Sequence, residues 1–252
     1  MSTFQIKEES IVYDAIVVGS GAGGGMAGYI LANAGLKVLM LEAGPFYDPA
    51  KDALQLRWSW ESPRRGANTT RPFGDFDAAF GGWQLEGEPY SVEKGTEFEW
   101  FRARMLGGRT NHWGRISLRM GPDDFKPKDA ITDEWPITYD EVKPFYDRVD
   151  RMIGIYGTVE NLPNEPDGIF LRPPKPRLNE HYIMRGAKKS GVTVIPGRGS
   201  VLTEALPGNK DRGTCFYCGQ CGRSCKVYGD FSSSSCLVIP AMKTGNLTYC
   251  NR

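Results

Sequence analysis

The chain has 252 residues, of which 40% are hydrophobic and 24% charged, and its formal net charge is +1. It can therefore bury a sizeable core, and its length suits one large globular domain or one and a half. The net charge is near zero and no basic run is longer than two residues. This charge pattern does not indicate binding to nucleic acid or to an anionic membrane. No apolar stretch approaches bilayer length, and residues 1–10 lack the pattern of an export signal.

The first predicted element is a strand over residues 11–18, a β-branched and apolar run. A glycine loop of the form G-x-G-x-x-G follows it. Apolar residues then recur at helical spacing until Gly35 ends the helix, and residues 37–43 return as a second buried strand. Three glycines define the loop: Gly19, Gly21 and Gly24.

This order of strand, turn, helix and strand, over residues 11–44, predicts a βαβ unit that binds a dinucleotide. The glycines let backbone N–H groups approach a pyrophosphate at the positive end of the helix. Glu42 ends the second strand, where a carboxylate can hydrogen-bond a ribose. The alternative is a glycine-rich turn in some other α/β protein, which would not explain why Glu42 lies at the end of the second strand.

Residues 45–135 are poor in long periodic runs, and glycine pairs and prolines interrupt them, so we expect long loops on a scaffold. All the tryptophans of the chain fall in this region. We expect burial in a core that covers a cofactor rather than exposed faces on which sugars stack. These tryptophans are Trp58, Trp60, Trp83, Trp100, Trp113 and Trp135.

The next elements are a capping-box pattern at 138–141 and an amphipathic helix after Pro144. Residues 161–177 carry five prolines and predict a linker or an extended arm. A helix over 180–190 and a strand over 192–195 are expected before the segment that holds most of the cysteines.

Four cysteines in the segment 212–236 have the spacing C-x2-C-x2-C-x3-C, which is typical of thiolates around an iron–sulfur cluster. Gly219 and Gly222 supply the backbone freedom that convergence of the thiolates requires. Zinc would more often present two separated cysteine pairs or cysteine with histidine, and a disulfide framework suits a short secreted chain. Cys236 and Cys250 read as ordinary small apolar residues. The predicted ligands are Cys215, Cys218, Cys221 and Cys225.

The cluster type stays open between 3Fe-4S and 4Fe-4S, because three thiolates suffice for the smaller core. Lys226 stands where a bacterial ferredoxin usually has proline, and with Arg223 it would offset the negative charge of a cluster. Clustered cysteines indicate assembly in a reducing compartment. We expect a cytoplasmic protein, or a periplasmic one exported together with a signal-bearing partner.

Residues 104–114 resemble the second flavin-contacting motif of the glucose-methanol-choline (GMC) oxidoreductases, and residues 41–44 resemble the end of that family's first motif. The resemblance extends over essentially the whole chain, 1–252, but reaches only the first half of such an enzyme. It is closest to the gluconate, glucose and glucoside dehydrogenase large subunits, some of which carry an iron–sulfur cluster. It implies an α/β, Rossmann-like FAD-binding domain with long loop insertions, truncated before the substrate domain is complete.

By this resemblance, ten residues bind FAD, and His112 contacts it through its side chain or its backbone. A covalent bond from His112 to the flavin, as in some GMC sugar oxidases, is left open. The expected cofactor-binding residues are Gly19, Gly21, Gly24, Glu42, Ala43, Arg104, Gly107, Gly108, Asn111 and His112.

The resemblance further implies an FAD-dependent dehydrogenase that oxidises a CH–OH group of a sugar or polyol and passes electrons through the cluster to partners, a small subunit and a cytochrome or another electron acceptor. Family members are roughly twice as long and carry the catalytic histidine near the C-terminus, so the catalytic residues are unknown and this fragment alone is expected to be inactive. His112 and His181 match no such context. The alternative is a zinc-stapled nucleotide-binding protein or an inactive remnant.

Overall fold

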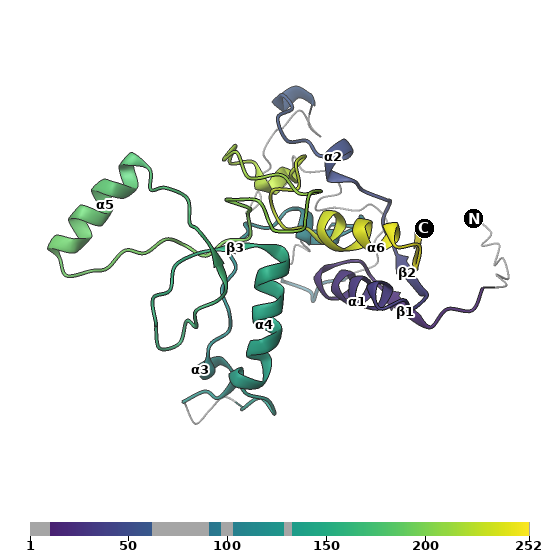
Figure 1. Ribbon diagram of the computed structural model, residues 1–252, viewed down its shortest axis with the longest axis horizontal. Coiled ribbons are helices and arrows are strands. Elements are labelled where there is room, and N and C mark those ends of the chain that lie inside the picture. Colours follow the sequence, from purple (N-terminus) through teal and green to yellow (C-terminus); the bar gives the residue numbers. More distant parts are fainter. Residues whose placement is uncertain (1–10, 62–90, 97–102, 129–132, 252) are drawn as a thin grey trace. The chain divides into compact units, whose positions relative to one another are not determined.

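The computed structural model describes residues 11–61, 91–96, 103–128 and 133–251 (Figure 1). These residues form two compact units. Unit 1 lies within Met1–His112 and Ser232–Arg252, and unit 2 is Trp113–Phe231. The chain therefore leaves unit 1 near the end of the segment 104–114, which resembles a flavin motif, and returns to it at Ser232, after the four clustered cysteines.

Unit 1 contains a three-stranded parallel sheet. Strands β1 (Ala15–Val18) and β2 (Val38–Glu42) pair in parallel around helix α1 (Ala22–Asn33), which confirms the predicted strand–helix–strand order. Strand β5 (Leu247–Asn251) comes from the far end of the chain and pairs in parallel with β2, so the sheet order is β1-β2-β5. Parallel neighbours need a crossover connection, which here includes all of unit 2.

One face of this sheet carries the core of unit 1. Val38 and Met40 of β2 are fully buried and pack with α1, with the π-helical turn η6 (Ser234–Val238) and with α6 (Ile239–Lys243). Side chains alternate along a strand, so the residues between them point to the opposite face. There Ile16 and Val18 of β1 are 64% and 81% exposed. Among the described residues, the helices of unit 1 thus cover one face of the sheet.

Unit 2 is organised around helix α4 (Tyr139–Ile153). Its predicted capping box is confirmed, since the N–H and the hydroxyl of Thr138 both donate to Glu141 at 2.8 Å. The expectation that the helix follows Pro144 is wrong, because α4 begins at Tyr139. Pro144 is the sixth residue of the helix, where it cannot donate a hydrogen bond to the carbonyl four residues earlier, yet the helix continues through it.

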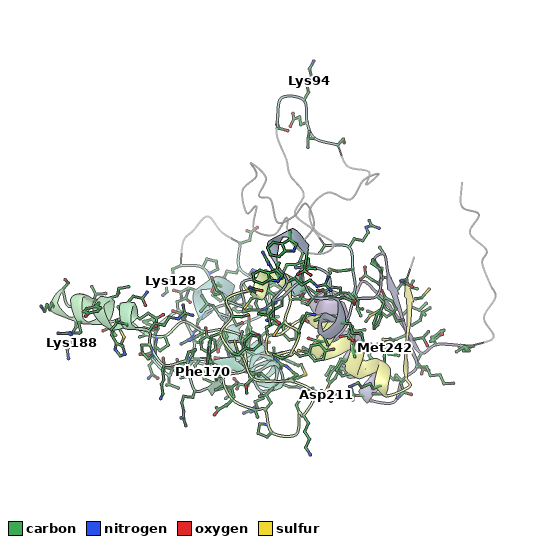
Figure 2. The ribbon with its side chains drawn as sticks, turned by 90° about the horizontal axis from the view of Figure 1, so that it is seen from above. Lys94, Lys128, Phe170, Lys188, Asp211 and Met242 are labelled. Carbon is green, nitrogen blue, oxygen red and sulfur yellow. The ribbon has the colours of Figure 1, made fainter. Side chains whose placement is uncertain are left out.

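The proline-rich segment 161–177 is not wholly an arm, because strand β4 (Phe170–Leu171) pairs in parallel with β3 (Ile155–Tyr156). Helix α5 (Leu178–Lys189) confirms the predicted helix, has no buried residue, and stands at the end of two long connections, with Lys188 near its tip (Figures 1 and 2). The strand predicted at 192–195 is absent from the strands of the described chain.

The remaining elements are single turns: α2 (Pro49–Asp52), η1 (Ser59–Glu61), η4 (Gly108–Asn111), α3 (Pro122–Phe125) and η5 (Cys221–Arg223). The expected burial of the tryptophans is wrong for three of them. Trp58 and Trp60 stack on each other with ring centroids 5.0 Å apart, and both are about two-thirds exposed, while Trp135 is 52% exposed. Trp83 and Trp100 lie outside the described residues. In the described part, no helix has the length and apolar character needed to cross a membrane.

Candidate cofactor site

The glycine loop of unit 1 leaves space at its first two glycines and closes on itself at the third. A Cβ atom added at Gly19 or Gly21 would meet nothing within 4 Å, whereas one at Gly24 would lie 2.0 Å from the carbonyl oxygen of Gly19. Gly21 is the N-cap of α1 and supplies no side-chain cap, and the first turn holds no acidic residue. The unpaired N–H groups and the helix dipole therefore favour an anion in this open space.

Glu42 lies at the carboxyl end of β2, and its carboxylate is fixed by the protein. Oε2 accepts hydrogen bonds from the N–H (3.0 Å) and the hydroxyl of Ser20, and Oε1 accepts one from the N–H of Gly44 (3.0 Å). Ser20 is fully buried, Glu42 is partly exposed and the neighbouring Ala43 is exposed. The geometry holds a carboxylate beside the glycine loop, where a ribose partner is expected.

The predicted second motif packs against this loop in the same unit. Gly107 has a left-handed backbone (φ 83°), and its N–H donates to the hydroxyl of Ser20 at 2.9 Å. The Asn111 amide, which is fully buried, donates to the carbonyls of Leu106 (2.8 Å) and Gly108 (3.1 Å).

His112, at the end of the same motif, is 2% exposed. Arg104 passes so close to Gly44 that a Cβ on this glycine would lie 2.2 Å from the Arg104 carbonyl carbon. The structure thus brings the residues of the two predicted flavin motifs together in one unit.

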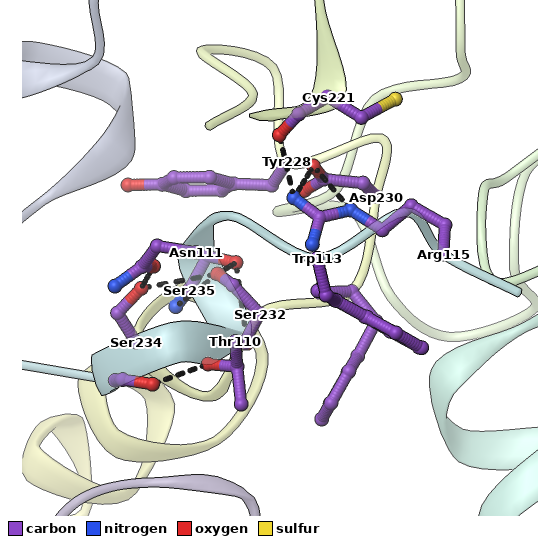
Figure 3. A network of polar contacts seen from close by, with 12 residues as sticks. Thr110, Asn111, Trp113, Arg115, Cys221, Tyr228, Asp230, Ser232, Ser234 and Ser235 are labelled. Carbon is purple, nitrogen blue, oxygen red and sulfur yellow. Dashed lines mark hydrogen bonds and ion pairs between the residues drawn. The ribbon is translucent and has the colours of Figure 1, made fainter. Parts of the chain in front are cut away.

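Serine side chains complete the arrangement, and sequence reasoning missed their role. Ser233 donates its hydroxyl to the carbonyls of Ser20 (2.7 Å) and Gly21 (3.1 Å), and its N–H donates to the Thr110 hydroxyl at 2.9 Å. The hydroxyl of Ser234 donates to Asn111 at 2.7 Å (Figure 3). The available signal was the run of four serines at 232–235, the last two of which begin η6, and π-helical turns are frequent at functional sites.

The cysteine loop (residues 213–229) belongs to unit 2. The N–H of Gly213 donates to the Val227 carbonyl, and that of Cys215 to the Leu202 carbonyl, both at 2.7 Å. Within this loop, Tyr217, Ser224 and Tyr228 adopt positive φ angles of 58°, 65° and 54°. Non-glycine residues rarely adopt this conformation, and it concentrates at functional and strained sites.

The four predicted ligand cysteines are free thiols, of which Cys225 is buried and the others partly buried. Burial raises the pKa of the Cys215 thiol and, with the neighbouring Asp230 and cysteines, raises the pKa of Cys221 to about 11 although Arg115 opposes the shift. The Tyr217 N–H donates to Cys215 Sγ at 3.3 Å. Nevertheless, within the described ranges no three or more His, Cys, Asp and Glu side chains form a group that could hold a metal ion.

Two buried arginines support the cysteine loop from within unit 2. Arg115 forms an ion pair with Asp230, both nearly inaccessible to solvent, and donates to the Cys221 carbonyl at 3.0 Å (Figure 3). Arg212 donates to the carbonyls of Tyr228 (3.1 Å) and Asp230 (3.2 Å). The path of the loop is therefore fixed by charge-assisted hydrogen bonds to its backbone.

No protein-family model matches the chain. It is 30% identical over 213 residues to 2-methyl-1,2-propanediol dehydrogenase of Mycolicibacterium austroafricanum, covering 78% of this chain and 35% of the relative. It is 25% identical to the fructose dehydrogenase large subunit of Gluconobacter japonicus (69% and 31% covered) and 22% identical to the gluconate 2-dehydrogenase flavoprotein of Pantoea cypripedii (91% and 42%). The chain thus spans well under half the length of these relatives.

Among solved structures, pyridoxine 4-oxidase from Mesorbium loti matches with a TM-score of 0.51 and 16% sequence identity. The match covers 95% of this chain and 42% of that chain. At this identity the similarity establishes the fold, and it agrees with the α/β class and parallel sheet of unit 1.

Proposed function

Because this chain belongs to the glucose-methanol-choline oxidoreductase family, we propose that it is the FAD-binding part of a dehydrogenase that oxidises a CH–OH group of a sugar or polyol. One observation carries the proposal: the glycine loop, Glu42 and residues 104–112 assemble beside open space at the N-terminus of α1. Relatives named for the oxidation of a diol, of fructose and of gluconate support the substrate class.

In this proposal the backbones of the loop glycines face the pyrophosphate and Glu42 faces the adenosine ribose, with Ala43 next to it. Bound FAD supplies a two-electron acceptor for the hydride of the substrate, while the chain binds and orients the cofactor. The residues proposed to bind FAD are Gly19, Gly21, Gly24, Glu42, Ala43, Arg104, Gly107, Gly108, Asn111 and His112.

The test is the flavin content of a Gly21→Leu variant. A Cβ at Gly21 would meet no protein atom within 4 Å, and the leucine side chain would fill the space assigned to the pyrophosphate, so we expect a normal fold and loss of bound flavin. Gly186→Leu is the matched control, because a Cβ at this glycine of α5 also meets nothing within 4 Å. Full retention of the paired flavin absorption bands by Gly21→Leu would contradict the proposed site.

We further propose that the cysteine loop holds an iron–sulfur cluster, 3Fe-4S or 4Fe-4S, which would accept single electrons and pass them to a small subunit and a cytochrome. The thiolate spacing, the left-handed residues of the loop and the N–H donor to Cys215 Sγ support this proposal. The cluster would be assembled in the cytoplasm, before any export with a partner. The proposed ligands are Cys215, Cys218, Cys221 and Cys225.

Metal and sulfide analysis of anaerobically purified protein, together with electron paramagnetic resonance, tests the cluster. We expect iron and acid-labile sulfide in the unmodified chain and their loss in Cys221→Ser. Cys250→Ser is the control, since this exposed cysteine lies in β5 of unit 1. Stoichiometric zinc without iron would instead assign the thiolates to a structural zinc site.

A further inference from the structure

The carboxylate of Glu42 has most of its acceptor capacity filled by the protein itself. Oε2 accepts two hydrogen bonds, both from Ser20, and Oε1 accepts one from the N–H of Gly44. An ionised carboxylate offers about two acceptor positions on each oxygen. Counting donors from the described residues, Oε2 is therefore filled, and Oε1 keeps one position for a further donor.

Ser20 in turn is fixed by hydrogen bonds with three residues, Glu42, Gly107 and Ser233. Its side chain is fully buried, and its hydroxyl donates to Glu42 while accepting from the N–H of Gly107 at 2.9 Å. Its carbonyl accepts from the hydroxyl of Ser233 at 2.7 Å. A single hydroxyl thus joins the end of β2 to the second flavin motif, and both of its partners fix its orientation.

We propose that Ser20 is a positioning residue for the cofactor ribose. It locks Glu42 through Oε2 so that the remaining acceptor position on Oε1 receives the 2′-hydroxyl of the adenosine ribose. This inference rests on the proposed FAD site and adds to it a residue that does not itself touch the ligand, together with the oxygen that does.

The physical basis is the loss of one of three donors. Ser20→Ala keeps the hydrogen bonds from the N–H of Ser20 to Oε2 and from the N–H of Gly44 to Oε1 but removes the hydroxyl, so two donors hold the carboxylate less firmly than three. The same change leaves the buried N–H of Gly107 without its acceptor. Both effects loosen the carboxylate that presents Oε1.

A comparison of ADP with 2′-deoxy-ADP separates positioning from general loosening. Binding of each is measured by calorimetry on the full chain after removal of bound flavin. Hydrogen bonds to charged groups are strong, so we expect the unmodified chain to bind ADP roughly tenfold more tightly than 2′-deoxy-ADP. In Ser20→Ala this preference should fall to about twofold or less, because the ribose 2′-hydroxyl and the Glu42 carboxylate no longer meet in a fixed geometry.

Thr244→Val is the matched control. It removes a hydroxyl of unit 1 that donates to the Ala241 carbonyl at 2.6 Å and lies outside the residues proposed to bind FAD, so it should keep the roughly tenfold preference while lowering overall stability. Ser20→Cys retains a weak donor of similar size and should give an intermediate preference even if Ser20→Ala folds poorly.

The outcomes are distinguishable. An unchanged preference for ADP in both Ser20→Ala and Ser20→Cys would overturn the positioning role while leaving the FAD site intact. An equal loss of preference in Thr244→Val would also overturn it, because the effect would then be general loosening. Failure of the unmodified chain to bind ADP, or to prefer it, would contradict the proposed ribose contact of Glu42 itself.

Discussion

The glycine loop of unit 1 and the cysteine loop of unit 2 are both held by buried polar contacts. They differ in whether the described residues already form the geometry of a binding site. Around the glycine loop, open space, helix N-terminus and fixed carboxylate stand together. In the cysteine loop the backbone is anchored, but the described side chains include no group that could hold a metal. A site made of backbone N–H groups takes its geometry from secondary structure, whereas a thiolate site takes its final geometry from the metal.

The largest expected effect comes from Gly24→Ala. The new Cβ would lie 2.0 Å from a backbone oxygen, which cannot move aside as a flexible side chain can. We expect unit 1 to lose more than about 3 kcal/mol of unfolding free energy, measured by urea denaturation. Gly23→Ala, where a Cβ meets nothing within 4 Å, should be neutral or stabilising by up to about 1 kcal/mol. Equal effects of the two changes would show that backbone packing does not define the glycine loop.

Arg115→Met tests the support of the cysteine loop. It leaves Asp230 as a buried charge without its guanidinium partner, so we expect a loss of about 3 kcal/mol of unfolding free energy in unit 2. Lys126→Met is the control, because Lys126 and Glu134 form an exposed ion pair worth less than about 1 kcal/mol. A variant as stable as the unmodified chain would mean that the ion pair does not anchor the loop.

Hydrogen exchange tests whether a metal completes the order of the cysteine loop. If the metal completes the thiolate site, amide protection in the cysteine loop should rise about tenfold when iron and sulfide are reconstituted, while the glycine loop should not change. Addition of FAD to metal-free protein should give the converse pattern. Equal protection of the cysteine loop with and without metal would show that it is already ordered by its backbone contacts.

The smallest expected effect is electrostatic. The hydrogen bond from Lys143, together with Arg119, holds the pKa of Asp147 below its usual range. Asp147 therefore stabilises unit 2 above the ordinary aspartate pKa near 4, and this contribution is lost as the pH falls below it. Between about pH 5 and pH 3, the unfolding free energy of Asp147→Asn should change less than that of the unmodified chain, by under about 0.5 kcal/mol, as measured by thermal unfolding. Identical pH slopes in the two proteins would contradict this assignment.

Local pattern was enough to predict the β1–α1–β2 unit, because β-branched runs, glycines and helical spacing act within a few residues of one another. The serine contacts could not be predicted in this way. Ser233 reaches Ser20 across 213 positions, so the partners are set by the fold and not by neighbouring residues. The run of serines was visible in the sequence, but its hydrogen-bond acceptors were not.

Other expectations failed where a local pattern lacked its tertiary partner. Residues 192–195 are β-branched and apolar, but in the described chain they are paired with no strand, and Val192 is 57% exposed. Propensity alone does not make a strand without neighbouring groups to bond. Pro144 misled in the opposite sense, since the capping box at Thr138 was a stronger start signal than the proline.

No described helix covers the face of β1 that carries Ile16 and Val18, and this has a consequence for how the chain behaves at high concentration. Ile16 and Val18 present apolar surface to water, and β1 is the outermost strand of the described sheet. Such an edge is a template for pairing with another copy, and adjacent apolar side chains strengthen the attachment. The light scattered per unit concentration should rise as the protein concentration rises. Val18→Thr should raise the concentration at which turbidity appears, because threonine retains the strand preference of valine while being more polar.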